Sequence, residues 1–553
     1  MTTRARAFSR RRLLQSSAVA AGAVTLTSAV GAGSAFATGI EAGNVEVFRH
    51  SVGSGDPLPD GVVLWTRITP SPDATPGSGI GPSCTVAWEM ASDNDFRKLV
   101  AQGTVRASPA RDHTVKADVR GLQSATGYFF RFRVLDGPAV GAVSRVGRTR
   151  TAPAANADVD LLRFGVCSCS NWEAGYFEAY RHMAARGDLD AVVHLGDFIY
   201  EYERGGYTGK SGAIRDHEPA HEIVTLADYR IRMGQYATDP DLAELRAGVP
   251  FIVTWDDHES ANDASRDGAE NHQPAEGDWQ VRRAASAQAY FEWMPTRPQS
   301  LDGGGHLYRA LRFGNLAELS MLDLRTYRDK QPSGLGQVDD PDRTMTGAAQ
   351  FDWLVGGLTT SAARWKIVGT SVMITPVLIP PLDPQATEAL TKMAGLPRGG
   401  IPYNTDQWDG YPAERRRLFD ALTGAGIDNV VFLTGDIHSS WACEVPVEPG
   451  RPGGAVVGTE YVAPSITSSN IDDMLDLPEG NPVSRAAEEA LKLANPHIKA
   501  VDLDRHGYLV FEITPDAVRA DYWFVGDKTA PASGLVPGLR FRTPADRPIV
   551  LPS

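Results

Sequence analysis

Four apolar runs in the sequence each end in side chains that can bind a metal ion. The clearest is AVVHLGDFIYE (191–201), where apolar residues stop at Gly196 and Asp197 and Tyr200 follow. The length of the run, its two valines and the glycine favour a buried strand over a helix. Open α/β sheets bind ligands beyond the carboxyl ends of their strands, so the stretch predicts a site at the end of this strand.

Three further stretches repeat the pattern of a short apolar run followed by thiol, carboxylate or imidazole groups: LLRFGVCSC (161–169), ending in Cys169; VPFIVTWDDHE (249–259), with Asp257 and His258; and VVFLTGDIH (430–438), with Asp436 and His438. Groups of this kind are costly to bury unpaired. Their convergence therefore predicts a multi-metal centre.

The order GD-x-x-Y, DDHE, GD-x-H resembles the calcineurin-like metallophosphoesterases, whose usual pattern is GD-x-x-D, GNHE, GH-x-H. Tyr200 replaces the second aspartate, Asp257 the asparagine and Asp436 the first histidine. Cys169 stands where an aspartate or histidine normally begins the site. These departures, together with an arginine-rich leader and the stretches SGDP (54–57), VLWT (63–66) and WDGYP (408–412), make the chain similar to the PhoD family of alkaline phosphatases and phosphodiesterases.

The donor chemistry indicates two kinds of metal. A strongly acidic cation suits thiolate, phenolate and carboxylate ligands, which predicts iron at Cys169, Asp197, Tyr200 and His438. The resemblance implies that this iron is ferric. Asp197 would bridge to oxygen ligands from Asp257 and Asp436, which fit calcium better than zinc, and the relatives suggest two Ca²⁺ ions. Whether Asp256, Asn262 or Asp409 completes these coordination shells stays open.

Two residues are candidates for contact with substrate. Cations at such a centre clamp phosphoryl oxygens and lower the pKa of bound water, so a metal-bound hydroxide or oxide would attack phosphorus in line. His258 would bind the phosphate or protonate the leaving alkoxide; the alternative is a structural histidine. Arg325 would bind a non-bridging oxygen; the alternative is an ion pair with Asp323 or Asp329.

Residues 1–37 have the features of an export signal rather than of folded structure. SRRRLL (9–14) is a twin-arginine type motif, and a mildly apolar stretch leads to the cleavage pattern A-x-A at 35–37. The stretch is too short and too polar for a retained spanning helix. We therefore expect a secreted protein exported by the twin-arginine machinery; the alternative is a basic disordered tail.

The formal charge of the chain is -14, and removal of the arginine-rich leader makes the remainder more acidic still. Proteins that track along nucleic acids need basic stripes, so this charge argues against that class of partner. It leaves open a small phosphoester or a zwitterionic phospholipid as substrate. No transmembrane segment is expected in the mature protein.

Two domains are expected after the leader. Short β-rich runs separated by turns predict a fibronectin-III or immunoglobulin-like sandwich over 40–150, with strands at 62–67, 84–90, 113–119 and 128–134. A Pro/Ala-rich linker (151–159) precedes a catalytic α/β domain over 160–530. Its expected helices are 175–186, 226–235, 280–293, 349–359 and 413–423, and its further strands are 317–324 and 366–373. The resemblance adds a four-layer α/β/β/α arrangement for this domain.

The four cysteines are few for a secreted protein. Cys167 and Cys169 are two residues apart on an expected strand, which does not give the geometry of a disulfide. A bridge that uses Cys84 stays open.

Three functions fit these observations. The first is a secreted metal-dependent phosphoester hydrolase, an alkaline phosphatase or phosphodiesterase of PhoD type. The second is a phospholipase D that cleaves phosphatidylcholine to choline and phosphatidate, because secreted actinobacterial phospholipases D of the iron-containing kind resemble the same family. The third is a non-catalytic secreted binding protein, whose mark would be missing metal ligands. Family members also continue past the end of this chain, so we expect a less covered site that admits bulkier esters.

Overall fold

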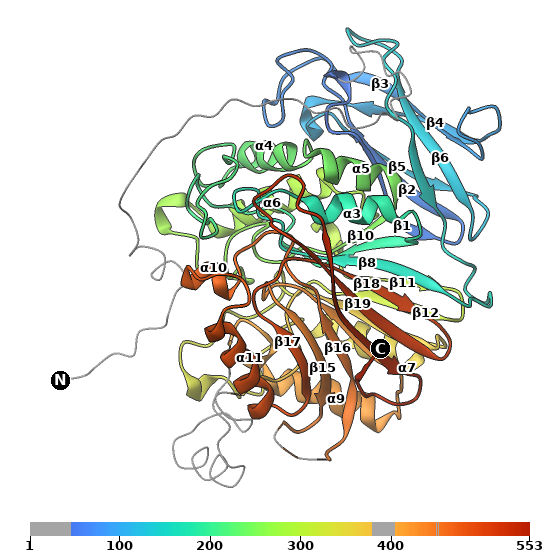
Figure 1. Cartoon of the computed structure of the whole chain (residues 1–553). Coiled ribbons are helices and arrows are strands. Elements are labelled where there is room, and N and C mark those ends of the chain that lie inside the picture. The colour runs from blue at the N-terminus through green and yellow to red at the C-terminus, as the bar shows by residue number, and fades with distance from the viewer. Residues whose placement is uncertain (1–45, 379–403, 450, 452) are drawn as a thin grey trace.

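The computed structural model describes residues 46–378, 404–449, 451 and 453–553. Two large β-sheets face each other at its centre, and helices cover their outer faces (Figure 1). The predicted leader, residues 1–37, lies outside the described residues.

The first sheet has ten strands in the order β21-β20-β19-β18-β8-β9-β10-β1-β2-β5. Their bounds are β1 Val52–Leu58, β2 Gly61–Arg67, β5 Thr114–Arg120, β8 Leu162–Cys167, β9 Ala191–His194, β10 Phe251–Val253, β18 Gly507–Ile513, β19 Ala517–Val525, β20 Leu535–Pro544 and β21 Leu551–Pro552. The second sheet has seven strands in the order β11-β12-β13-β14-β16-β15-β17. These are β11 Arg309–Phe313, β12 Ala317–Met321, β13 Trp365–Thr370, β14 Val430–Thr434, β15 Ser440–Pro446, β16 Val456–Val462 and β17 Ile498–Asp502.

Both faces of the central strands are buried, which explains their continuous apolar runs. Successive side chains of a strand point to opposite faces. In β9, Val193 lies in the core between the two sheets, with Ile367 and Leu433 of the second sheet. Its neighbour Val192 packs in the core beneath the helices, with Met183. The predicted four-layer α/β/β/α fold is confirmed.

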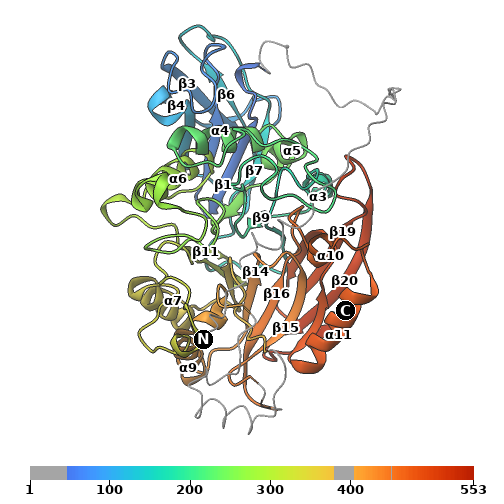
Figure 2. The ribbon, with the colours of Figure 1, turned by 90° about the vertical axis from the view of Figure 1, so that its left-hand side faces the viewer.

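The helices form the two outer layers: α3 Glu178–Arg186, α4 Leu226–Tyr236, α5 Pro240–Gly248 and α6 Trp279–Trp293 on the first sheet, and α7 Ala348–Thr360 and α9 Pro412–Gly424 on the second. Figure 2 shows these two layers on opposite sides of the sheets. The five expected helices are present, and α3 begins three residues later than expected. The structure adds α5, whose N-cap Asp239 accepts backbone hydrogen bonds ahead of Pro240. It also adds α10 Ile471–Leu475 and α11 Pro482–Ala494.

A four-stranded sheet, β4-β3-β6-β7, completes a sandwich with β1, β2 and β5. Its strands are β3 Cys84–Ala91, β4 Leu99–Ala107, β6 Gly127–Val134 and β7 Gly147–Arg150. The expected all-β sandwich is present. The sandwich strands β1, β2 and β5 are part of the ten-stranded sheet, because β1 pairs in parallel with β10.

All four cysteines are buried and free. The disulfide through Cys84 that the sequence left open does not form in this structure. Within the described residues, no helix is both long and apolar enough to cross a membrane.

Candidate metal centre

The predicted site residues lie in loops at the carboxyl ends of strands from both sheets. β8, β9 and β10 are neighbouring parallel strands of the first sheet, and β14 belongs to the second. The loop after each strand carries at least one predicted ligand. All six predicted metal ligands, as well as His258 and Arg325, are buried.

One cluster, here called the thiol–phenol group, consists of Cys169, Asp197, Tyr200 and His438. One ligand atom each of Cys169, Asp197 and His438 lies within 4.8 Å of the other two. The Tyr200 Oη donates to Asp197 Oδ2 at 2.9 Å and lies 3.3 Å from His438 Nε2. Sulfur, oxygen and nitrogen donors therefore face one small volume.

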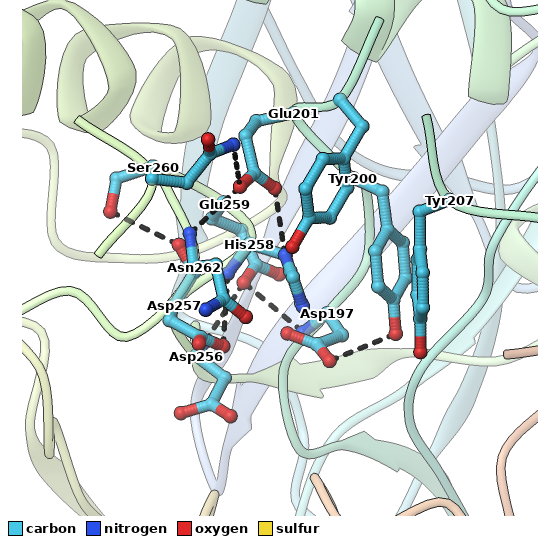
Figure 3. Close-up of polar contacts among 12 residues, drawn as sticks. Asp197, Tyr200, Glu201, Tyr207, Asp256, Asp257, His258, Glu259, Ser260 and Asn262 are labelled. Atoms are coloured by element: carbon cyan, nitrogen blue, oxygen red, sulfur yellow. Dashed lines mark hydrogen bonds and ion pairs between the residues drawn. The ribbon is translucent and has the colours of Figure 1, made fainter. Parts of the chain in front are cut away.

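A second cluster, here called the carboxylate group, consists of Asp197, Asp256, Asp257 and Asp436. One carboxylate oxygen of each lies within 4.8 Å of the others. Asp197 belongs to both groups, and Figure 3 shows it between Tyr200 and the loop that carries Asp257. The predicted bridging position of Asp197 matches this arrangement, and Asp256, left open by the sequence, joins the group.

The backbone is unusual at the predicted ligands. Cys169, Asp197, Asp436 and His438 have φ between 54° and 63°, a region that residues other than glycine adopt uncommonly. Such conformations cost free energy and collect at functional sites, where the surrounding structure holds them. Each residue lies within four residues of the end of a strand, so the turn that directs the side chain into the site begins at once.

Arg325 is the cation that pairs with the carboxylate group. Its guanidinium forms a two-point contact with Asp256 at 2.5 and 3.0 Å, and Nη1 donates to Asp406 at 3.0 Å. Its Nη2 also lies 3.6 Å from Asp257 and 3.5 Å from Asp436. The ion pair of the alternative interpretation is present, but its expected partners Asp323 and Asp329 were wrong, because the guanidinium reaches Asp256 and Asp406 instead.

Glu259 holds the two loops of the first sheet together. Its carboxylate accepts backbone hydrogen bonds from Asp197, Phe198 and Asp256 at 2.7–3.1 Å. Burial raises the pKa of Glu259 to about 7, against the effect of these donors. Glu259 thus fixes the backbone on which Asp197 and Asp256 stand, and it binds no other side chain of the site in the contacts described.

His258 is held by a carboxylate from the loop after β9. Its Nδ1 lies 2.7 Å from Glu201 Oε2, and both side chains are buried (Figure 3). Glu201 Oε1 accepts from the Asn262 backbone and from the Asn271 side chain, each at 2.8 Å. Burial alone would lower the pKa of His258, but Asp257, Glu201 and Asp197 raise it well above its usual value.

The ionisable groups of this site are poorly stabilised in the absence of bound cations. Burial raises the pKa of Cys169 and of Tyr200, in each case with a contribution from Asp197. Burial also raises the pKa of Asp197, whose Oδ1 has no hydrogen-bond partner. The buried Asn262 Oδ1 is likewise unpartnered. Bound cations would stabilise the anionic forms and satisfy these oxygens.

Asp409, the remaining candidate left open, lies outside these groups. It pairs with Arg415 at 2.6 Å and accepts from the Val377 backbone at 3.0 Å. The nearby Asp406 contacts Arg325 instead, and one of its oxygens clusters with Asp257 and Asp263. The stretch WDGYP drew attention to Asp409, whereas no local signal marks Asp406.

Comparison with known proteins identifies the family. The model of the PhoD-like phosphatase family matches residues 164–522, and the model of the PhoD-like phosphatase N-terminal domain matches residues 33–153. The chain belongs to the PhoD-like phosphatase family. This membership confirms the resemblance and the predicted enzyme class, a metal-dependent phosphoric ester hydrolase.

Similar proteins agree with the family. The chain is 37% identical to alkaline phosphatase D of Bacillus subtilis (strain 168) over 543 residues, covering 96% of this chain and 86% of the relative. A solved structure of PhoD matches with a TM-score of 0.80 and 35% identity over 92% of each chain. A purple acid phosphatase from yellow lupin seeds, at 9% identity and a TM-score of 0.50, covers 89% of this chain and 73% of its own and shares the fold.

Proposed function

We propose that this protein is a secreted alkaline phosphatase and phosphodiesterase of PhoD type that uses ferric iron and calcium. The observation that carries the proposal is the shared Asp197, which joins the thiol–phenol group to the carboxylate group. A thiol, a phenol and an imidazole suit iron on one side, and four carboxylates suit calcium on the other.

The residues that would hold the metals follow from the two groups. Cys169, Asp197, Tyr200 and His438 would bind Fe³⁺, and Asp257 and Asp436, with Asp197 as bridge, would bind Ca²⁺. The unpartnered Asn262 Oδ1 is available to calcium, and Asp256, although paired with Arg325, keeps lone pairs that a cation can share. With these oxygens we propose two Ca²⁺ ions. When bound, such cations withdraw charge from phosphoryl oxygens and supply a hydroxide or oxide nucleophile at moderate pH.

His258 would act on the substrate through Nε2. The acceptor Glu201 lies 2.7 Å from Nδ1, which keeps the Nδ1 proton in place. Nε2 is then the ring nitrogen that can meet a phosphoryl or leaving-group oxygen. Cations neutralise Asp197 and Asp257 when they bind, so Glu201 remains the carboxylate that favours a protonated ring.

Arg325 would bind a non-bridging phosphoryl oxygen. Its Nε and Nη2 stay with Asp256, while its bonds to Asp406 are the ones that a phosphoryl group can replace. Asp406 keeps Arg328 and Gln331 as partners, each at 2.6 Å, so it does not lose all its donors in the exchange.

Export rests on the sequence of the leader, with its arginine motif and cleavage pattern. We infer that the twin-arginine machinery exports the protein after folding. Replacement of Arg10 and Arg11 by lysine should retain the protein in the cytoplasm, as measured by cell fractionation.

The activity is tested with metal-loaded protein on a soluble phosphomonoester, a soluble phosphodiester and phosphatidylcholine, each with and without a calcium chelator. We expect hydrolysis of the soluble esters and its loss with the chelator. Release of choline from phosphatidylcholine far faster than turnover of the soluble esters would make the enzyme a phospholipase D instead.

A variant pair tests the iron ligands in the same assay. Cys169→Ser and Tyr200→Phe should lose bound iron and activity while the far-UV circular dichroism stays unchanged. Retention of both iron and activity would leave the thiol and the phenol with a structural role. No hydrolysis of any ester by the metal-loaded protein would support a non-catalytic binding protein.

A further inference from the structure

The loop between β16 and α10 contacts three members of the thiol–phenol group. The backbone amides of Thr467 and Ser468 both donate to the Cys169 carbonyl at 3.3 Å. The Ser469 carbonyl lies 2.9 Å from His438 Nδ1. This loop carries none of the proposed metal ligands, yet it contacts the ligands directly.

The Ser468 hydroxyl reaches the phenol oxygen of Tyr200. Its Oγ lies 2.5 Å from Tyr200 Oη, and its other acceptor is the Cys169 carbonyl at 2.9 Å. The Ser468 side chain is fully buried, so water does not compete for its proton. This separation of the two oxygens lies at the short end of the range of about 2.5–3.0 Å for O–H···O hydrogen bonds.

The other neighbours of Tyr200 Oη in the described structure offer it no proton. Asp197 Oδ2, at 2.9 Å, is an acceptor. His438 Nδ1 faces the Ser469 carbonyl, which can only accept, so Nδ1 carries the ring proton. His438 Nε2, 3.3 Å from Oη, is then a lone pair suited to a metal. When Tyr200 serves as a ligand its oxygen carries no proton, and its negative charge makes it a stronger acceptor for the single hydroxyl proton of Ser468 than the neutral Cys169 carbonyl.

The backbone of Ser468 is fixed from the opposite side. Lys528 Nζ donates to the Thr467 carbonyl at 2.9 Å. The Ser468 carbonyl accepts from Ser465 Oγ at 2.8 Å and lies 3.0 Å from His506 Nε2. Lys528 and His506 are themselves buried. These contacts therefore fix the backbone from which the Ser468 hydroxyl extends.

We propose that Ser468 is a positioning residue that donates a hydrogen bond to the phenolate of Tyr200 and thereby limits the negative charge that this ligand gives to the bound iron. The inference rests on the proposed function, because it requires Fe³⁺ at the thiol–phenol group. Outer hydrogen bonds of this kind orient metal ligands and tune the metal. Without the hydrogen bond from Ser468, the phenolate is a more electron-rich ligand than with it.

The test is the visible charge-transfer absorption of the ferric protein, in which the band that enhances the tyrosinate modes in resonance Raman spectra is the phenolate-to-iron band and not that of the Cys169 thiolate. Ser468→Ala should move this band to longer wavelength, because the phenolate loses the bond that stabilises its electrons. Ser469→Ala is the matched control. It deletes the neighbouring hydroxyl, which donates to the Thr208 carbonyl at 3.1 Å, and should leave the band in place.

The outcomes separate this inference from the proposed function. Ferric protein without a phenolate-to-iron band would refute iron ligation by Tyr200, whatever Ser468 does. A wild-type band that Ser468→Ala leaves unmoved would overturn the inference alone, as would an equal shift in Ser469→Ala.

Should Ser468→Ala fail to fold, resonance Raman spectra of the wild-type protein provide a second measurement. For protein unfolded, refolded and loaded with iron in D₂O, the Tyr200 C–O stretch should shift relative to H₂O. An unchanged stretch would refute the hydrogen bond.

Discussion

Glu201→Gln tests how the loop after β9 controls His258. The glutamine has the size of the glutamate, and its oxygen would face the two donors from Asn262 and Asn271. Its NH₂ group would then face His258 Nδ1, where the structure has an acceptor. Nδ1 would have to accept from this group, which favours the neutral ring with its proton on Nε2. The doubly protonated ring, the stronger acid toward a leaving group, would lose its counter-charge.

The magnitude follows from the bond that is lost. Burial alone would raise the pKa of Glu201, but His258 lowers it below the usual value, so Glu201 is an anion in this contact. A hydrogen bond to a charged group contributes about 1.5–3 kcal/mol. At about 1.36 kcal/mol per tenfold change in rate, the loss corresponds to roughly 10- to 150-fold in kcat/KM.

The assay compares two diesters, one with a nitrophenol and one with an alkyl alcohol as leaving group. Because a poor leaving group needs the proton from His258 more, the loss should be larger for the alkyl ester. Asn271→Ala is the control, since it removes one donor to Glu201 but leaves the contact with His258. Activity of Glu201→Gln within about twofold of wild type on both esters would refute the reasoning. An equal loss on both esters together with loss of bound metal would show a structural role for Glu201.

Further predictions concern the second metal group, the stability of the site and a lysine remote from it. Asp257→Asn should lower activity by more than about a hundredfold, because loss of even an outer hydrogen-bond partner of a metal ligand costs about 10- to 100-fold and Asp257 would be a ligand itself. Its calcium content, measured by elemental analysis, should fall while the iron content is retained. Chelation should lower the midpoint of thermal unfolding, because the carboxylate group would lose the cations that neutralise it in addition to Arg325. A cation at a hundred times its Kd stabilises the folded protein by about 2.7 kcal/mol. Burial lowers the pKa of Lys116 from 10.5 to about 7, so the unfolded chain binds the extra proton between these values and the free energy of unfolding should rise with pH across that window. Lys116→Met should remove this component of the rise, as measured by denaturant unfolding at several pH values.

The site residues that could be predicted are those whose signal is local. Cys169, Asp197 and Asp436 follow apolar runs within a few residues, and the turn that directs each side chain begins at the end of its strand. Cys169 and Asp197 follow neighbouring parallel strands of one sheet, so their convergence also followed from the pattern. Asp436 follows β14 of the second sheet, so its place beside them depends on how the two sheets are stacked.

The partners of Arg325 show why the rest could not be predicted. The sequence offers Asp323 and Asp329 as neighbours, but the guanidinium pairs with Asp256 and Asp406, 69 and 81 positions away. Ser468 lies 268 positions from Tyr200, and no local pattern marks it as a partner. Contacts of this kind depend on how the two sheets are stacked, which the spacing of residues along one strand does not specify.

The pairing of β1 with β10 matters for any attempt to shorten the protein. β10 is only three residues long, and the loop that carries Asp256 and Asp257 follows it directly. β9 covers one edge of β10, and β1 covers the other. A truncated chain that begins after the linker would leave the second edge bare, as a template for pairing with other molecules. Such a chain should aggregate, and β10 would no longer hold the loop with Asp256 and Asp257 in position. The N-terminal segment therefore supports both the solubility of the protein and the geometry of the site.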